Sequence, residues 1–174
     1  RVAVLASGGG SNLQALLDHA ARLGSARAYD VALVAANAAT AGALDRARRH
    51  DVAAAVLDDS ADGDRILALL DAHAIDLVVL AGYLKLVPAA VARRFHGRML
   101  NVHPALLPAF GGAGMYGARV HRAVLDAGAR LSGATVHFVD EHYDRGAIVA
   151  QWPVPVFDGD TPATLAARVL RVEH

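Results

Sequence analysis

The sequence predicts an α/β fold, with a mostly parallel sheet, helices on both of its faces and one antiparallel strand pair near the C-terminus. Short, continuously apolar runs of buried-strand length alternate with segments whose apolar residues recur every three or four positions. Because each such strand is followed by a helix, right-handed crossovers should join the strands and make them parallel. After residue 110, two apolar runs follow each other with only a short turn between them, which predicts the antiparallel pair.

The expected elements can be placed in order along the chain. Strands are expected at residues 2–6, 31–36, 53–57, 76–83 and 99–103, with helices between them at 12–23, 41–50, 64–74 and 88–95. Beyond the glycine-rich loop "GGAGMYG", residues 132–140 and 147–156 form the expected antiparallel pair. Ligands of parallel sheets bind at the carboxyl ends of the strands, so the loops that follow the strands should carry the functional residues.

Size and composition limit the class of protein. The 174 residues, 55% of them hydrophobic, are enough for one soluble domain with a substantial core. The 17 basic residues balance the 17 acidic ones, so neither nucleic acid nor an anionic membrane is expected as a partner. The absence of cysteine excludes disulfides and zinc–cysteine sites and fits a reducing compartment, the cytoplasm. No apolar run reaches the ~18 residues that a membrane span needs.

A glycine-rich turn, "SGGGSN" at residues 7–12, follows the first expected strand. Its glycines let the backbone turn sharply and approach a ligand, and Ser11 or Asn12 could cap the next helix, whose free N–H groups would face an anion. The turn therefore predicts a phosphate site, while a turn that binds nothing stays open. It is not a dinucleotide fingerprint, because Leu13 replaces the third glycine, nor a nucleoside-triphosphate loop, because no Gly-Lys-Ser/Thr follows.

The fifth expected strand ends in polar residues. Asn101 and His103 are two positions apart, so on a strand both side chains lie on one face near its carboxyl end. Pro104 cannot donate to a strand ladder, so the strand should end at His103. Such a pair is either a hydrogen-bonded plug or a functional site.

A second polar cluster lies in the turn between the last two expected strands and contains Asp140, Glu141 and Asp144. A carboxylate against an imidazole raises the histidine pKa and fixes its tautomer, so Asp144 is expected to make His103 an acid near neutral pH. An acidic surface turn remains the alternative. His137, Glu141 and His142 could also be read as metal ligands, but they lack a recognised ligand spacing.

Four segments, "SGGGSNLQAL", "VVLAGYLKLV", "NVHPALLPAFGG" and "VHFVDEHYDRGAIVAQ", together resemble the folate-dependent phosphoribosylglycinamide formyltransferases of purine synthesis over essentially the whole chain. The resemblance implies a Rossmann-like formyltransferase fold in one domain, 1–174, with a phosphate-binding half at about 1–98 and a catalytic and folate-side half at about 99–174. It implies transfer of a formyl group from 10-formyltetrahydrofolate, as co-substrate, to glycinamide ribonucleotide in the cytoplasm, without a metal. A homodimer is left open.

The resemblance also implies roles for particular residues. The family's catalytic residues match Asn101, His103 and Asp144. Its residues for the ribosyl phosphate substrate match Gly10, Ser11, Asn12 and Glu173. Its folate-contacting positions match Leu84, Lys85, Leu86, Val87, Asn101, Asp140, Glu141 and Asp144. Ala105, Arg145 and Ala147 depart from the family's usual pattern, which bears on loop geometry more than on chemistry.

The chemistry of formyl transfer fits these residue types. When an amine attacks the formyl carbon, an oxyanion develops that Asn101 and protonated His103 could stabilise, while His103 and Asp144 move the proton. Two other functions stay open. A formyl-folate hydrolase would use the same residues with water as nucleophile, and a non-catalytic nucleotide-binding module would need neither His103 nor Asp144. Hydrolases of this superfamily typically have a second histidine where this chain has Pro104.

Overall fold

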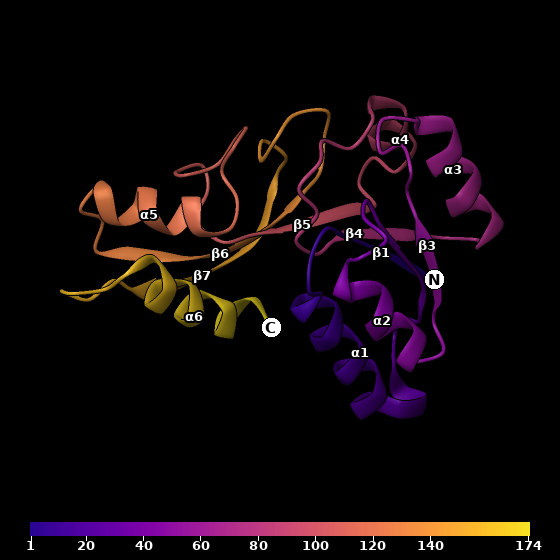
Figure 1. Cartoon of the computed structure of the whole chain (residues 1–174), viewed down its shortest axis with the longest axis horizontal. Helices are drawn as coiled ribbons and strands as arrows, with labels where there is room; N and C mark the ends of the chain where they lie inside the picture. Colours follow the sequence, from indigo (N-terminus) through magenta and orange to yellow (C-terminus); the bar gives the residue numbers. More distant parts are fainter. The chain divides into compact units, whose positions relative to one another are not determined.

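The computed structural model describes residues 1–174 and contains one seven-stranded sheet in the order β3-β2-β1-β4-β5-β6-β7. The predicted α/β class, with a mostly parallel sheet and an antiparallel C-terminal strand pair, is confirmed. The chain divides into two compact units, Arg1–Leu100 and Asn101–His174 (Figure 1). No helix is both long enough and apolar enough to cross a membrane.

The N-terminal unit alternates strands and helices. Its elements are β1 (Val2–Ala6), α1 (Ser11–Leu23), η1 (Gly24–Ala26), β2 (Val31–Ala36), α2 (Gly42–Arg49), β3 (Ala53–Val56), α3 (Gly63–Ala72), β4 (Leu77–Leu80) and α4 (Ala89–Arg94). Strand β1 pairs in parallel with β2 and β4, and β2 pairs in parallel with β3. In Figure 1, α1 and α2 lie on one side of these strands and α3 and α4 on the other.

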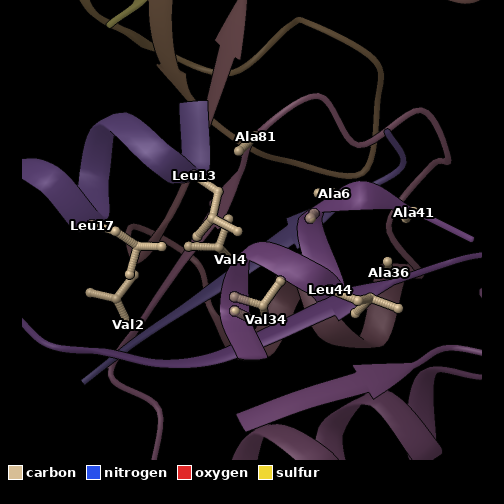
Figure 2. Close-up of a cluster of buried hydrophobic side chains, with 12 residues drawn as sticks. Val2, Val4, Ala6, Leu13, Leu17, Val34, Ala36, Ala41, Leu44 and Ala81 are labelled. Carbon is tan, nitrogen blue, oxygen red and sulfur yellow. The ribbon is translucent and has the colours of Figure 1, made fainter. Parts of the chain in front are cut away.

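A core of small and branched aliphatic side chains joins β1, β2, α1 and α2 (Figure 2). Val4 and Val34 lie side by side as register partners on neighbouring strands, and Leu13 and Leu44 cover them from the two helices. All four side chains are buried, and each such burial stabilises the fold by about 1.5–3 kcal/mol. Because Leu13 belongs to the first turn of α1, this packing fixes where the glycine-rich turn leaves β1 and enters the helix.

The strand order reverses between β1 and β4, and such a reversal is where open parallel sheets bind ligands. The glycine-rich turn follows β1 and the segment Gly82–Val87 follows β4. Ser7 connects the two: its N–H donates to the Gly82 carbonyl (3.0 Å), and its Oγ accepts from the Leu84 N–H (2.9 Å). Ser7 therefore holds together the two segments of this unit that are predicted to bind ligands.

The C-terminal unit contains most of β5 (Met99–His103), followed by α5 (Ala118–Asp126), β6 (Leu131–Phe138), β7 (Ile148–Pro155) and α6 (Pro162–Glu173). Strands β6 and β7 pair antiparallel, with a register shift between Val136 and His137. The helices and these two strands share one apolar cluster: Val124, Ala134, Val154, Leu165 and Val169.

Several local expectations needed correction. The strand expected at 76–83 ends at Leu80, because the chain turns at Gly82, where φ is +70°. The connection between β6 and β7 runs over residues 139–147 and is longer than the predicted short turn. Helix α5 was not expected, because it directly follows the glycine-rich run. The four predicted helices are present, with ends shifted by one or two residues.

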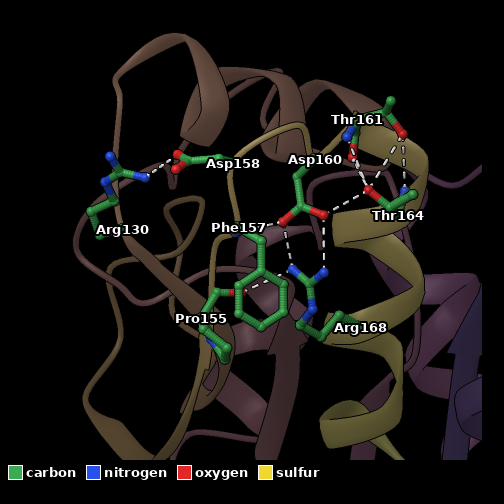
Figure 3. A network of polar contacts seen from close by, with 8 residues as sticks. All are labelled: Arg130, Pro155, Phe157, Asp158, Asp160, Thr161, Thr164 and Arg168. Atoms are coloured by element: carbon green, nitrogen blue, oxygen red, sulfur yellow. Dashed lines mark hydrogen bonds and ion pairs between the residues drawn. The ribbon is translucent and has the colours of Figure 1, made fainter.

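Arg168 joins helix α6 to the end of β7 (Figure 3). Its guanidinium forms two bonds to the Asp160 carboxylate (2.6 and 2.9 Å), donates to the Pro155 carbonyl and lies 4.3 Å from the Phe157 ring centre. Asp160 also accepts from the Phe157 N–H and the Thr164 hydroxyl, so its ionised form is held from several sides. The Arg168 guanidinium and these hydrogen bonds hold the Asp160 pKa well below its ordinary value.

Asp160→Asn should lower the free energy of unfolding at pH 7, because it removes a carboxylate that the folded state stabilises. A carboxyl group whose pKa is lowered by folding contributes its full stability above its unfolded pKa of about 3.9. This contribution is lost as the pH falls from there toward the pKa of the folded state. The difference between wild type and variant should therefore be full at pH 7 and shrink below about pH 4, as measured by urea unfolding across pH. Asp158→Asn is the control, because Asp158 pairs with Arg130 at an exposed site. Equal effects of the two variants would contradict this account.

Candidate active site

Four polar side chains of the C-terminal unit meet at the end of β5. Asn101 and His103 belong to β5, His137 lies on the adjacent strand β6, and Asp144 comes from the loop between β6 and β7. The Asp144 carboxylate is 3.4 Å from His103 Nδ1, 3.4 Å from Asn101 Nδ2 and 3.5 Å from His137 Nε2. The structure thus brings together the three residues predicted as catalytic, with His137 in addition.

The His103 ring is fixed at both nitrogens, and its side chain is only 3% exposed. A carbonyl oxygen can only accept, so the 2.9 Å contact with the Phe110 carbonyl assigns the donor to Nε2. The Nδ1 atom then faces the Asp144 carboxylate. Any proton that His103 gains or loses in this arrangement is therefore exchanged at Nδ1.

Asp144 has a left-handed backbone, with φ of +55°. This conformation is uncommon for residues other than glycine and persists where the surrounding structure holds it. Here the Gly112 N–H donates to Oδ2 (2.8 Å), while Asn101 and His137 face Oδ1. The conformation directs the carboxylate toward the end of β5 instead of into solvent.

His137 was not predicted to join this cluster. Its Nδ1 donates to the Phe138 carbonyl (2.8 Å), which leaves Nε2 to accept from Asn101 Nδ2 (3.0 Å). The Asn101 amide is thereby oriented with its nitrogen toward Asp144. In the sequence, the only signal for His137 is its place on an expected strand, where it also fits a metal-ligand reading with Glu141 and His142. No group of three or more histidine, cysteine, aspartate or glutamate side chains has an arrangement that could hold a metal ion.

The predicted rise in the His103 pKa is wrong in its net direction. Burial lowers the pKa of His103 most, and the nearby His137 lowers it as well, whereas Asp144, the Phe110 carbonyl and Glu173 raise it. The resulting pKa of His103 lies below the ordinary value of about 6.5, so the ring is mainly neutral at pH 7. Asp144 acts in the predicted direction, but it only partly offsets burial.

Asp144 remains ionised at neutral pH. Burial favours its neutral form, but the contact with His137, the charge that His103 carries once it is protonated at acid pH, and the Gly112 N–H together outweigh burial and lower the Asp144 pKa. The cluster at pH 7 therefore holds a carboxylate beside a mainly neutral imidazole, an arrangement that can accept a proton and return it.

The other site residues predicted in this unit lie on the loop and on the last helix. Asp140 Oδ1 accepts from the His142 N–H (2.8 Å), and the neighbouring Glu141 is exposed. Glu173 is the last residue of α6, and its charge raises the pKa of His103, so it belongs to the electrostatic surroundings of the cluster.

The predicted phosphate residues lie where β1 passes into α1. Gly10 occupies the N-cap position with φ of +73°, and Ser11 and Asn12 begin the helix. The expectation that Ser11 or Asn12 caps α1 is wrong, because no side chain makes a capping bond there. The N-terminal N–H groups of α1 have no acceptor within the helix, and such groups attract anions.

The predicted folate segment is an irregular stretch after β4. Leu84 and Leu86 are 43% and 44% exposed, Lys85 is exposed, and Val87 is buried. Exposed leucines on a segment anchored through Ser7 can provide an apolar surface for a flat ligand, while Val87 holds the segment to the core.

The fold and the site define a class of protein: a Rossmann-like α/β protein with a glycine-rich turn after its first strand and a buried histidine–aspartate cluster at the end of β5. The chain belongs to the formyl transferase family, whose model matches residues 1–174. The family predicted from the sequence is thereby confirmed.

Relatives with known names support this membership. A protein named phosphoribosylglycinamide formyltransferase, chloroplastic, from Vigna unguiculata is 44% identical over the whole of this chain, and its namesake from Arabidopsis thaliana is also 44% identical. The chain spans 57% and 61% of their lengths. A crystal structure of glycinamide ribonucleotide transformylase 1 from Symbiobacterium toebii superposes with a TM-score of 0.91 at 42% identity, covering 100% of this chain and 82% of that one.

Proposed function

We propose that this protein transfers the formyl group of 10-formyltetrahydrofolate to the amine of glycinamide ribonucleotide in purine biosynthesis. The products are formylglycinamide ribonucleotide and tetrahydrofolate. The observation that carries the proposal is the buried contact between His103 and Asp144 beside Asn101. The names of the relatives at 44% identity support the choice of substrates.

The reaction needs a proton to move between two nitrogens. The amine nitrogen attacks the formyl carbon and forms a new C–N bond, and a tetrahedral oxyanion develops. The bond from that carbon to the folate nitrogen then breaks. One proton leaves the attacking amine and one reaches the departing folate nitrogen, so no net proton is consumed.

Asp144 and His103 form the proton relay in this proposal. Asp144 is ionised and takes the proton of the amine, directly or through water, and His103 Nδ1 shares it across the 3.4 Å contact. The bond from His103 Nε2 to the Phe110 carbonyl keeps Nδ1 toward the carboxylate throughout. The same pair then returns the proton to the folate nitrogen.

Asn101 stabilises the oxyanion. One hydrogen of its Nδ2 bonds to His137 Nε2 (3.0 Å). The other faces Asp144 in a long contact (3.4 Å) and is the one that turns to the formyl oxygen when the substrates bind. Catalytic hydrogen bonds commonly form fully only in the substrate complex.

The remaining predicted residues bind the two substrates. Gly10, Ser11 and Asn12 hold the ribosyl phosphate through backbone N–H groups, and Glu173 contacts the ribosyl substrate. The residues proposed to contact the folate are Leu84, Lys85, Leu86, Val87, Asn101, Asp140, Glu141 and Asp144. The family model runs without a break from residue 1 to 174, which supports one formyltransferase domain built from both units.

One assay tests the function. The purified protein is supplied with 10-formyltetrahydrofolate, with and without glycinamide ribonucleotide, and the formation of tetrahydrofolate and formylated ribonucleotide is followed. Equal amounts of both products, formed only with the amine present, are expected. Tetrahydrofolate released without the amine would favour the hydrolase, and no turnover would favour a non-catalytic binding module.

Leu86→Asp should weaken folate binding by about tenfold or more, because a charge replaces an exposed apolar side chain in the proposed folate segment. The KM for glycinamide ribonucleotide should change little. Steady-state kinetics with each substrate varied in turn measures both constants. Leu131→Asp is the control, because Leu131 is also an exposed leucine and lies at the start of β6. Unchanged folate affinity in a folded Leu86→Asp protein would place the folate elsewhere.

We also propose the cytoplasm as compartment and a homodimer as assembly. The cysteine-free sequence supports the first. Exposed apolar side chains on the edge strand β7, namely Ile148, Val149 and Trp152, support the second. Cell fractionation and sedimentation of the purified protein test these two proposals separately.

A further inference from the structure

We infer that Arg46 is a positioning residue that holds the glycine-rich turn in its anion-binding form. The inference concerns the N-terminal unit alone and rests on the proposed function for the identity of the anion, a phosphate monoester. Arg46 lies on α2, far along the sequence from the turn at residues 7–12, and was not among the predicted site residues.

Two groups of α2 hold two successive carbonyl oxygens of the turn. The Ala43 N–H donates to the Gly8 carbonyl (3.1 Å), and Arg46 Nε donates to the Gly9 carbonyl (2.7 Å). In a planar trans peptide, the carbonyl and the N–H of one unit point in opposite directions. The N–H groups of Gly9 and Gly10 are therefore directed away from α2. Successive N–H groups with a common direction form a concave site for an anion.

The turn lies directly on α2, so the two bonds are part of a close fit. A Cβ atom added to Gly10 would lie 2.9 Å from Cα and Cβ of Ala43 and 3.4 Å from Cδ of Arg46. The aliphatic part of Arg46 thus packs against Gly10 while its Nε holds the preceding carbonyl. Loss of the side chain would release the Gly9–Gly10 peptide from one of its supports.

The other end of the guanidinium connects the turn to α1. Arg46 Nη1 donates to Gln14 Oε1 (2.9 Å), and Gln14 Nε2 in turn donates to Asp18 Oδ1 (2.8 Å). One planar group therefore spans the turn and the start of the helix whose N-terminal N–H groups face the anion. Its acceptors are a carbonyl and an amide oxygen, neither of which carries a full negative charge, so the positive charge of Arg46 also favours an anion at the turn.

Arg46→Met tests the inference, because methionine keeps most of the aliphatic contact and removes both donors. We expect the KM for glycinamide ribonucleotide to rise about tenfold or more, with kcat and the KM for the folate each within about threefold of wild type. Arg46→Lys keeps the charge but cannot donate in two directions from a rigid plane, and should stay clearly defective. Arg48→Met on the same helix is the control, because Arg48 is exposed and bonds to Asp45.

A second measurement is independent of turnover. Titration with inorganic phosphate, followed through the amide resonances of Gly9 and Gly10, should give a dissociation constant about tenfold weaker in Arg46→Met than in wild type. Equal titrations, a full rescue by Arg46→Lys, or a wild-type turn that does not respond to phosphate would each overturn the role of Arg46. A wild-type protein whose phosphate affinity depends on Arg46 but which does not formylate glycinamide ribonucleotide would overturn the proposed function alone.

Discussion

Asp144→Asn should reduce kcat by about two orders of magnitude or more, while the affinity for glycinamide ribonucleotide stays nearly unchanged. Asparagine has almost the same shape and tolerates the left-handed backbone at this position, so the loop should keep its conformation. What is lost is the negative charge beside His103 Nδ1 and the group that accepts the amine's proton. The expected loss is within the range that a positioned acid or base contributes.

The same substitution should lower the His103 pKa further. Burial already holds that pKa below its ordinary value, and Asp144 is the strongest of the groups that raise it. An NMR titration of the His103 ring in wild type and Asp144→Asn measures this change. Asp158→Asn, at an exposed aspartate, should leave both the titration and turnover unchanged. An unchanged His103 titration in Asp144→Asn would show that the two side chains are not coupled.

A double substitution shows whether the two residues act as one unit. In a shared relay, Asp144→Asn combined with His103→Ala should cost little more than the larger single loss. Losses that add fully on a logarithmic scale would mean that each residue acts on the substrates independently.

Gly10→Ala should raise the KM for glycinamide ribonucleotide by about tenfold to a hundredfold, with a much smaller effect on the KM for the folate. The added Cβ would lie 2.9 Å from backbone and side-chain atoms of Ala43, so the turn or the start of α2 must shift. A positive φ also disfavours alanine by roughly 1 kcal/mol. The shift would misdirect the N–H groups proposed to hold the phosphate.

Gly159→Ala separates the steric contact with Ala43 from the effect of the positive φ. Gly159 has a similar positive φ of +82°, but a Cβ there meets nothing within 4 Å. It should lower stability through the backbone alone and leave both KM values unchanged. A parallel rise of both KM values in Gly10→Ala would indicate general distortion and contradict a phosphate-specific role for the turn.

Much of the fold could be predicted because its strands are marked locally. The runs at 2–6, 31–36 and 99–103 are strands with those bounds, since continuous apolar segments of that length fit a sheet covered on both faces. The strand predicted at 76–83 is longer than the observed strand β4, because "AGY" is apolar in composition but the chain turns at Gly82. Helix α5 was missed because a glycine-rich run precedes it and its polar residues weaken a short apolar pattern.

The candidate site was predictable only as far as local spacing reaches. The interval between Asn101 and His103 places both on one strand, and the acidic loop supplies Asp144. His137 joins them because β5 and β6 are neighbours, which is a non-local pairing that no short pattern contains. The predicted direction of the His103 pKa shift is wrong for a related reason. Burial depends on many elements packed around the ring, whereas the effect of a charged neighbour can be predicted from one residue.

The left-handed backbone at Asp144 limits which amino acids can replace it during evolution. Aspartate and asparagine adopt that conformation far more readily than most residues, and glycine does so freely. Glutamate keeps the charge but lacks this tolerance, so it is not a neutral exchange here even though it is a carboxylate. A lineage that abandons the reaction can therefore drift to asparagine or glycine at this position with its loop intact, and either residue would mark a domain that has kept its shape after losing its chemistry.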